Sequence, residues 1–223
     1  MDISQNKKKL LIFIVLIAVI IVVILLLQNN SAINLDTQQD KQEESITTDL
    51  KEFTDKQKEI FGQREATNPK DSSAKRELSR AYYLSRDYEK AEALIKEAIA
   101  LDGSNPQFYV DFGRIYEAKK DTTNAEKMYK KAIELNTKEI EIKNEITKET
   151  KMSIYGIPTP YTALAGLYLS TNQLDKSAQI LLEGIKVNEK YPYFYSLLSD
   201  VYEKLGDTQK SKSYEEQFQK LIK

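Results

Sequence analysis

The sequence predicts an all-α fold, in which an array of about four helix-turn-helix repeats follows a single transmembrane helix. Three observations predict it. Small and aromatic residues recur with a period of 34 residues over the C-terminal two thirds of the chain. Residues 10–27 form an unbroken apolar run near the N-terminus. Only 7 Gly and 5 Pro among 223 residues favour helices over a turn-rich β fold.

Composition argues against several classes of function. The 33 Lys and Arg residues balance 34 Asp and Glu residues, so no positive excess attracts nucleic acid, and no nucleic-acid partner is expected. The absence of Cys and His removes thiol chemistry, imidazole metal sites and every catalytic triad that needs an imidazole base. Carboxylate pairs such as Glu215 and Glu216 lie in charge-rich segments. We therefore expect no enzyme activity, no cofactor and no metal site.

Residues 10–27, LLIFIVLIAVIIVVILLL, are predicted to be a transmembrane signal anchor. As a helix this run is about 27 Å long, close to the roughly 30 Å of a bilayer core. A buried core helix would be polar on some face. A cleaved signal peptide would have a shorter apolar region, of about 7 to 15 residues, and a small-residue cleavage site. Residues 28–32 offer no convincing site of that kind.

Basic residues flank the apolar run on one side only. Lys7, Lys8 and Lys9 directly precede it, whereas the first basic residue after it is Lys41. The positive-inside rule then places residues 1–9 in the cytoplasm. The expected location is the cell (inner) membrane, as a single-pass protein whose repeat domain is extracytoplasmic.

Two segments separate the predicted span from the repeats. Residues 28–45 are polar and lack helical periodicity, which predicts a flexible linker. Residues 46–66 are predicted to be an amphipathic helix, because their apolar side chains fall mostly at helical spacings; these are Ile46, Leu50, Phe53, Ile60 and Phe61. The helix either caps the first repeat or forms a coiled-coil dimer, although it holds only about two heptads.

The repeats are predicted at residues 72–105, 106–139, 158–191 and 192–223. The second is the clearest, and its pattern residues are Tyr109, Phe112, Gly113, Tyr116, Ala125, Tyr129 and Ala132. Gly113 and Ala125 are small where two helices must cross closely, and the aromatic residues fill the space around the crossing. In the fourth repeat, Glu215 stands where an apolar residue is expected. It predicts a terminal helix with a solvated outer face.

Residues 140–157 form an insertion that breaks the 34-residue register. Its charged residues alternate at helical spacing, so the second helix of repeat two is expected to continue into it before a loop near Gly156. The insertion is either a structural spacer or a projection that binds a partner, since insertions in repeat arrays map to one face.

The repeat pattern resembles the tetratricopeptide repeat, whose 34-residue signature places aromatic, small and apolar residues in this order. The resemblance covers about residues 72–223. It implies a right-handed α-solenoid whose first helices line a concave surface. In the family that surface commonly takes up an extended peptide or a partner helix, so the resemblance implies a protein or peptide partner.

The helical phase that buries Phe112 and Tyr116 predicts which residues line the open side of the first helices. They are Arg76, Arg80, Tyr83, Asp111, Arg114, Thr162, Gly166, Tyr193, Ser196 and Asp200. Three arginines gather in the first two repeats, which predicts a ligand with acidic or aromatic residues. Chaperone-binding members of the family hold a C-terminal carboxylate with Lys and Asn. No such clamp is predicted, because the third repeat offers only Thr162, Ala163 and Gly166.

These features predict a membrane-anchored scaffold for protein-protein interaction. The chain is similar to bacterial envelope proteins with one N-terminal span and an external repeat domain, including accessory subunits of the protein-export channel. Two alternatives remain open. One is an architectural membrane protein that self-associates into a homo-oligomer. The other is a cytosol-facing receptor similar to the signal-anchored import receptors of the mitochondrial outer membrane.

Overall fold

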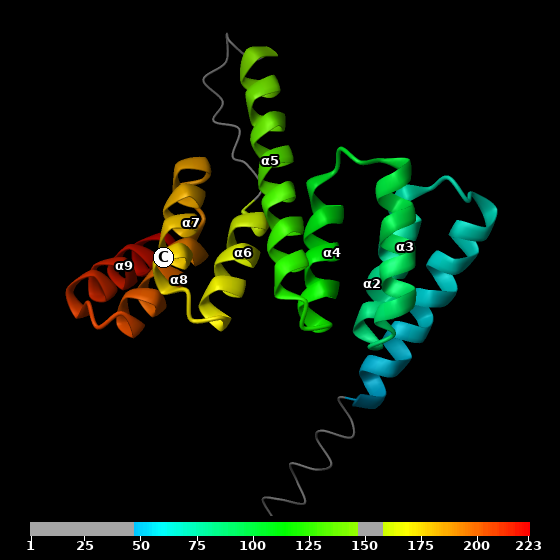
Figure 1. Cartoon of the computed structure of the whole chain (residues 1–223), viewed down its shortest axis with the longest axis horizontal. Helices are drawn as coiled ribbons and strands as arrows, with labels where there is room; N and C mark the ends of the chain where they lie inside the picture. Colours follow the sequence, from blue (N-terminus) through cyan, green and yellow to red (C-terminus); the bar gives the residue numbers. More distant parts are fainter. Residues whose placement is uncertain (1–46, 147–157) are drawn as a thin grey trace, which may run out of the picture. The chain divides into compact units, whose positions relative to one another are not determined.

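The computed structural model describes residues 47–146 and 158–223 (Figure 1). The predicted anchor, the linker and residues 147–157 of the insertion lie outside this part of the chain. Thr54–Lys223 forms one compact unit. The other unit, Met1–Phe53, is described only from residue 47 onward, where it is helical. All regular elements in the described residues are helices, and none of these helices is long and apolar enough to cross a bilayer.

The compact unit consists of four helical hairpins after an initial helix that ends at residue 67. The first hairpin joins α2 (Ser72–Leu84) to α3 (Tyr88–Leu101), and the second joins α4 (Pro106–Ala118) to α5 (Thr122–Ile146). The third joins α6 (Thr159–Ser170) to α7 (Leu174–Val187), and the fourth joins α8 (Pro192–Lys204) to α9 (Thr208–Leu221). The predicted all-α repeat architecture is thereby confirmed. We call α2, α4, α6 and α8 the first helices and the others the second helices.

Short polar residues begin most of these helices. The Asp71 and Asn105 side chains accept hydrogen bonds from the first-turn amides of α2 and α4. Asp87, Asp121 and Asp207 do the same for α3, α5 and α9. Such caps satisfy amide groups that have no partner inside the helix. The turn just before each second helix contains one residue with left-handed backbone; these residues are Arg86, Lys120, Asn172 and Gly206.

The two helices of each hairpin cross at the small residues that the sequence pattern identified. A Cβ atom at Gly113 would collide with the Tyr129 ring, so only glycine lets α4 and α5 approach this closely. In the first and fourth repeats a serine occupies the position equivalent to Gly113. The Ser79 hydroxyl donates a 2.7 Å hydrogen bond to the Ala91 carbonyl, and Ser199 donates a 3.0 Å bond to the Ser211 carbonyl. These serines link the helices as well as leaving space.

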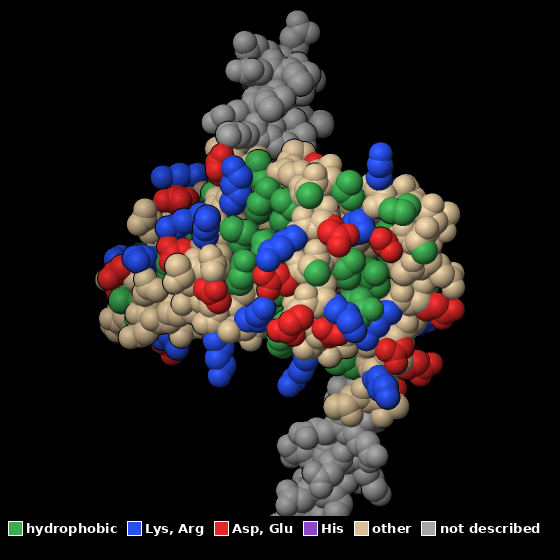
Figure 2. Space-filling model, turned by 45° about the vertical axis from the view of Figure 1, so that its right-hand side comes forward, with side chains coloured by type: hydrophobic (Ala, Val, Ile, Leu, Met, Phe, Trp, Pro, Cys, Tyr) green, Lys and Arg blue, Asp and Glu red, His purple; other side chains and the backbone are tan. Residues whose placement is uncertain are grey.

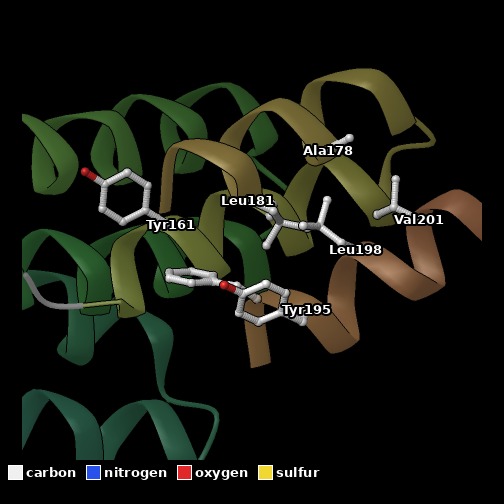
Figure 3. Packing of buried hydrophobic residues seen from close by; sticks show 8 residues of the cluster. Tyr161, Ala178, Leu181, Tyr195, Leu198 and Val201 are labelled. Carbon is white, nitrogen blue, oxygen red and sulfur yellow. The ribbon is translucent and has the colours of Figure 1, made fainter. Parts of the chain in front are cut away.

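The core is a series of apolar clusters that join neighbouring hairpins. Figure 3 shows one of them, in which Leu181 of α7 meets Leu198 of α8. The Tyr161 and Phe194 rings pack edge to face in the same cluster, with centroids 6.4 Å apart. The last helix, α9, has no buried residue, and Glu215 is exposed. The prediction of a solvated terminal helix is confirmed.

The helical residues 54–67, which we call the cap helix, pack against the first hairpin. Lys75 of α2 is nearly buried and donates hydrogen bonds to Glu65 of the cap helix at 2.7 Å and to Glu97 of α3 at 2.6 Å. These hydrogen bonds raise the pKa of Lys75, which keeps its charge. Thr54 is also buried. Residues 54–66 of the predicted amphipathic helix thus lie against the first repeat, as the cap interpretation expected for this part of it.

The helix α5 is 25 residues long, whereas the other helices of the hairpins have 12 to 14. Its C-terminal part extends beyond the first turn of α4 in Figure 1. Residues 140–146, the first part of the predicted insertion, are its last two turns. The expected continuation of this helix is therefore present, and the remainder of the insertion lies outside the described residues.

Candidate functional site

The first helices form one continuous face of the compact unit. Each first helix contacts the next one, α2 to α4, α4 to α6 and α6 to α8. Within the described residues, consecutive second helices make no such contacts with each other. The hairpins are therefore closer together on the side of the first helices, which makes that side the concave one. We call it the first-helix face.

All ten predicted groove residues lie on first helices. They are Arg76, Arg80 and Tyr83 on α2, Asp111 and Arg114 on α4, Thr162 and Gly166 on α6, and Tyr193, Ser196 and Asp200 on α8. Four of them come together around a pocket of about 120 Å³ between α2 and α4, which we call the α2–α4 pocket. Its lining residues are Ser79, Arg80, Tyr83, Leu84, Asp111, Arg114 and Ile115.

A network of ion pairs surrounds this pocket. In each of the two helices an acid precedes an arginine by three residues. Glu77 pairs with Arg80 at 3.1 Å, and Asp111 pairs with Arg114 at 3.4 Å. Arg76 joins the two helices, because its Nε donates to Asp111 at 2.6 Å while its terminal nitrogen lies 2.9 Å from Glu77. Arg76 thus fixes the spacing of α2 and α4 at the pocket.

Asp111 differs from its predicted placement on an open surface, since its side chain is only 5% exposed. Helical phase gives the direction of a side chain but not the depth of the groove in which it lies. Burial raises the pKa of Asp111, and the neighbouring Arg76 acts in the opposite direction. A buried carboxylate is tolerated where cations satisfy its oxygens. Asp111 therefore holds the arginines in place, and little of its side chain is accessible in the pocket lining.

The two other arginines are the accessible charges of the pocket. The side chains of Arg80 and Arg114 are 47% and 43% exposed, whereas Arg76 is 21% exposed. A guanidinium carries five N–H donors in a planar fork that matches a carboxylate. Arg80 and Arg114 each make one of the side-chain hydrogen bonds described above, so both retain donors for a further acceptor.

Sequence reasoning missed the apolar part of this site. Leu84, at the end of α2, is 40% exposed, and Ile115 of α4 is buried; both residues line the pocket. Tyr83 also lines the pocket and is half-buried against Tyr88, with ring centroids 5.9 Å apart. Burial raises the pKa of the Tyr83 hydroxyl, which therefore stays protonated as a hydrogen-bond donor. The signal available in the sequence for this apolar part was Leu84, which directly follows Tyr83.

The other half of the first-helix face has a different character. Thr162 donates a hydrogen bond to the Thr159 carbonyl of its own helix. Nothing lies within 4 Å of the place where Gly166 would carry a Cβ, so space is open there. Tyr193 is 61% exposed and leans on Tyr191. Asp200 is exposed, with its pKa raised by partial burial and by Glu203 and Glu215. The predicted residues of this half include no basic side chain.

Charge is mixed over the part of the surface that Figure 2 displays. Basic and acidic side chains alternate there, with small apolar patches between them. Within the described residues, no group of three or more His, Cys, Asp or Glu side chains could hold a metal ion. The arrangement is suited to contacts with a polypeptide, through guanidinium forks, aromatic rings and a pocket for a side chain.

Sequence comparison identifies two of the repeats. Residues 106–139 and 192–222 match a family model described as a tetratricopeptide repeat. They coincide with the second and fourth predicted repeats, so the prediction of tetratricopeptide repeats is supported there. The other two hairpins complete the same helix-turn-helix pattern in the structure. The comparison with curated proteins found no match.

Several solved structures share the fold. MamA is 16% identical, with 74% of this chain and 86% of that one covered and a TM-score of 0.56. PilF of Pseudomonas aeruginosa is 14% identical, with 75% and 68% covered and a TM-score of 0.57. Yeast Tom70 is 19% identical, with 76% and 33% covered and a TM-score of 0.60. At these identities the likeness shows the all-α tetratricopeptide-like solenoid alone.

Proposed function

We propose that the protein is a membrane-anchored scaffold whose first-helix face binds an extended segment of a partner protein outside the cytoplasm. The observation that carries this proposal is the α2–α4 pocket, where exposed guanidinium groups, a tyrosine and an apolar wall meet on the concave side of a repeat array. Pockets that combine apolar walls with a few oriented polar groups are the usual form of a recognition site. Concave solenoid surfaces are suited to extended ligands.

The expected setting is the cell envelope, in assembly or in protein export. The apolar run at residues 10–27 and the lysines before it support an inner-membrane anchor with a cytoplasmic N-terminus. One protein of similar fold, PilW, is described as a type IV pilus biogenesis factor. Its likeness is limited to the fold, and the role in the envelope is our proposal.

Topology is tested by adding protease to the outside of intact spheroplasts. The repeat domain should be digested and a short anchor fragment should remain in the membrane. Protection of the repeat domain until the membrane is permeabilised would reverse the proposed orientation and favour the cytosol-facing receptor.

Partner binding is tested by placing a photoreactive amino acid at Leu84 in the full-length protein in its own membrane. The matched control position is Leu182 on α7, a second helix, because the two leucines are similarly exposed, at 40% and 37%. We expect a discrete crosslinked partner from position 84 and none from position 182. Equal crosslinking from both positions would reject the first-helix face as the binding surface.

The variant Arg80→Ala with Arg114→Ala should then weaken binding of that partner by about tenfold. Both side chains are nearly half exposed, so each contact is worth about 0.7 kcal/mol, and the two together account for the tenfold change. The competing interpretation assigns binding to the insertion, and it is tested by replacing residues 140–156 with a short Gly-Ser linker. Loss of the partner only in that second variant would move the site to the insertion.

A second candidate function is self-association into an architectural homo-oligomer. Leu50 and Phe53 favour it, because they are large apolar side chains three residues apart on helical residues and are 43% and 52% exposed. Sedimentation of the full-length protein over a range of concentrations measures it. A mass that stays monomeric at high concentration would exclude this role.

A further inference from the structure

We propose that the α2–α4 pocket selects a particular element of its partner, namely one large apolar side chain with an acidic residue beside it in sequence. This inference rests on the proposed function, since it specifies which segment the first-helix face would recognise. The acidic group is the side chain of Asp or Glu within an extended segment.

The size and lining of the pocket indicate the apolar side chain. Ile115 is buried in the pocket, while Leu84 and Tyr83 present apolar surface at its edge. The volume of about 120 Å³ is close to the roughly 150 Å³ of an engineered apolar cavity that binds benzene. One aromatic or branched aliphatic side chain fits such a space, whereas a whole helix does not.

The charges at the pocket indicate the neighbouring acid. The lining contains Arg80, Arg114 and Asp111, and the carboxylate of Asp111 is buried. Two other acids lie beside the pocket, and both accept hydrogen bonds within the protein: Glu77 from Arg76 and Arg80, and Glu117 from the Tyr129 hydroxyl. A ligand that approaches the pocket therefore meets guanidinium groups with remaining donors, which suit a carboxylate.

The second repeat carries different residues at the positions equivalent to those near the pocket. In the second hairpin, the Tyr129 ring lies over Gly113 and its hydroxyl reaches Glu117 at 2.7 Å. The residues 34 positions earlier are Ile95, Ser79 and Tyr83. Isoleucine has no ring or hydroxyl that could extend toward Tyr83 as Tyr129 extends toward Glu117, and Ser79 and Tyr83 both line the pocket. The residues at these equivalent positions therefore differ between the two repeats.

The rest of the first-helix face indicates an internal segment and not a chain terminus. Beyond α4, the face continues over α6, where Thr162 is small and Gly166 has open space above it. A polypeptide that places a side chain in the pocket therefore has open space at Gly166 if it continues toward α6.

The test uses the full-length protein and an array of short synthetic peptides. Each peptide carries one pair of residues at its centre, between Gly and Ser residues, and has a C-terminal amide. The array as a whole covers every combination of two residues. We expect the protein to prefer pairs such as Phe-Glu or Leu-Asp. Fluorescence anisotropy measures the affinities in solution. The Phe-Gln and Ala-Glu peptides should each bind at least about tenfold more weakly than the Phe-Glu peptide.

Charge reversal distinguishes a change in the site from a loss of folding, because an unfolded protein would lose all preference and would not gain a new one. The variant Arg80→Glu with Arg114→Glu should turn the preference from acidic toward basic neighbours while the preference for an apolar residue remains. The control, Lys127→Glu with Lys186→Glu, makes the same charge change at exposed positions on second helices and should leave the preference for acidic pairs unchanged. In the same way, Leu84→Ser should weaken selection of the apolar residue, and Leu182→Ser should not.

The outcomes separate this inference from the proposed function. Selection of peptides without an apolar and acidic pair, or selection that the Arg80→Glu and Arg114→Glu variant leaves unchanged, would overturn the inference while the first-helix face remains a binding surface. Stronger binding of free-acid peptides than of amides, whatever their central residues, would show recognition of a chain terminus and would also overturn it. No selection at all would overturn both.

Discussion

The two halves of the first-helix face share one backbone pattern and differ in chemistry. At the positions of Arg80 and Arg114, the third and fourth repeats carry Gly166 and Asp200. At the position of Asp111, they carry Ala163 and Leu197. Packing constrains the small and aromatic residues at each crossing, whereas these positions carry different residues from one repeat to the next. Any recognition by the first-helix face is therefore specified by individual repeats.

The largest expected effect concerns the buried acid of the α2–α4 half. Asp111→Ala should lower the free energy of unfolding by about 3 kcal/mol, because Arg76 and Arg114 lose the buried carboxylate that they share, and Arg76 keeps only Glu77 of its own helix. This value is at the low end for a broken buried pair, because Arg76 is partly exposed. Chemical denaturation of the two proteins measures the difference.

Asp200→Ala is the matched change in the other half of the face. Asp200 is exposed and lies near the acids Glu203 and Glu215, so its removal should change stability by less than about 0.5 kcal/mol. Equal losses in the two variants would mean that the ion pairs of the α2–α4 half carry no special stability.

The repeats themselves could be predicted because each depends on a local pattern. The 34-residue period identifies residues that are buried in the structure, such as Ala91, Ala125 and Leu164. Small residues at a helix crossing are a requirement of close packing, so their spacing reveals the crossing. The hydrogen bonds that Ser79 and Ser199 make across their crossings could not be predicted, since the pattern requires only a small residue there.

The next prediction compares two glycines on first helices. Gly113→Ala should cost about 2 kcal/mol net, because overpacking against Tyr129 of about 3 kcal/mol exceeds a helix-propensity gain of about 1 kcal/mol. Gly166→Ala should instead stabilise the protein by up to about 1 kcal/mol, since its Cβ enters open space. Thermal unfolding of both variants measures these opposite signs. A loss of stability in both would show that the open space at Gly166 is filled.

The candidate site could be predicted only in part. Helical phase predicted that Arg80, Arg114 and Tyr83 share one side of the first helices, because a 3.6-residue period fixes the direction of each side chain. All three line the α2–α4 pocket. The burial of Asp111 depends on how closely α2 and α4 approach, which is a tertiary distance that the period does not contain. The pocket is lined by residues of α2 and α4, which belong to two different repeats, so it depends on the same tertiary distance. The anchor at residues 10–27 stays a prediction.

The smallest expected effect lies in the turns between the two helices of each hairpin. Their left-handed residues are Arg86 and Lys120 in the first half, with φ of 62° at both, and Asn172 and Gly206 in the second, with φ of 57° and 78°. Only Gly adopts this conformation without strain, and Asn tolerates it better than Arg or Lys.

Replacing Lys120 by Gly should therefore raise the free energy of unfolding by about 0.5 to 1 kcal/mol, because relief of the strained backbone exceeds the added freedom of the unfolded chain. The Lys120 side chain is exposed, so little packing is lost. The same change at Asn172 should gain only a few tenths of a kcal/mol. Denaturant unfolding of the two variants gives the comparison directly. A larger gain at Asn172 than at Lys120 would mean that local backbone strain does not distinguish the two halves of the array.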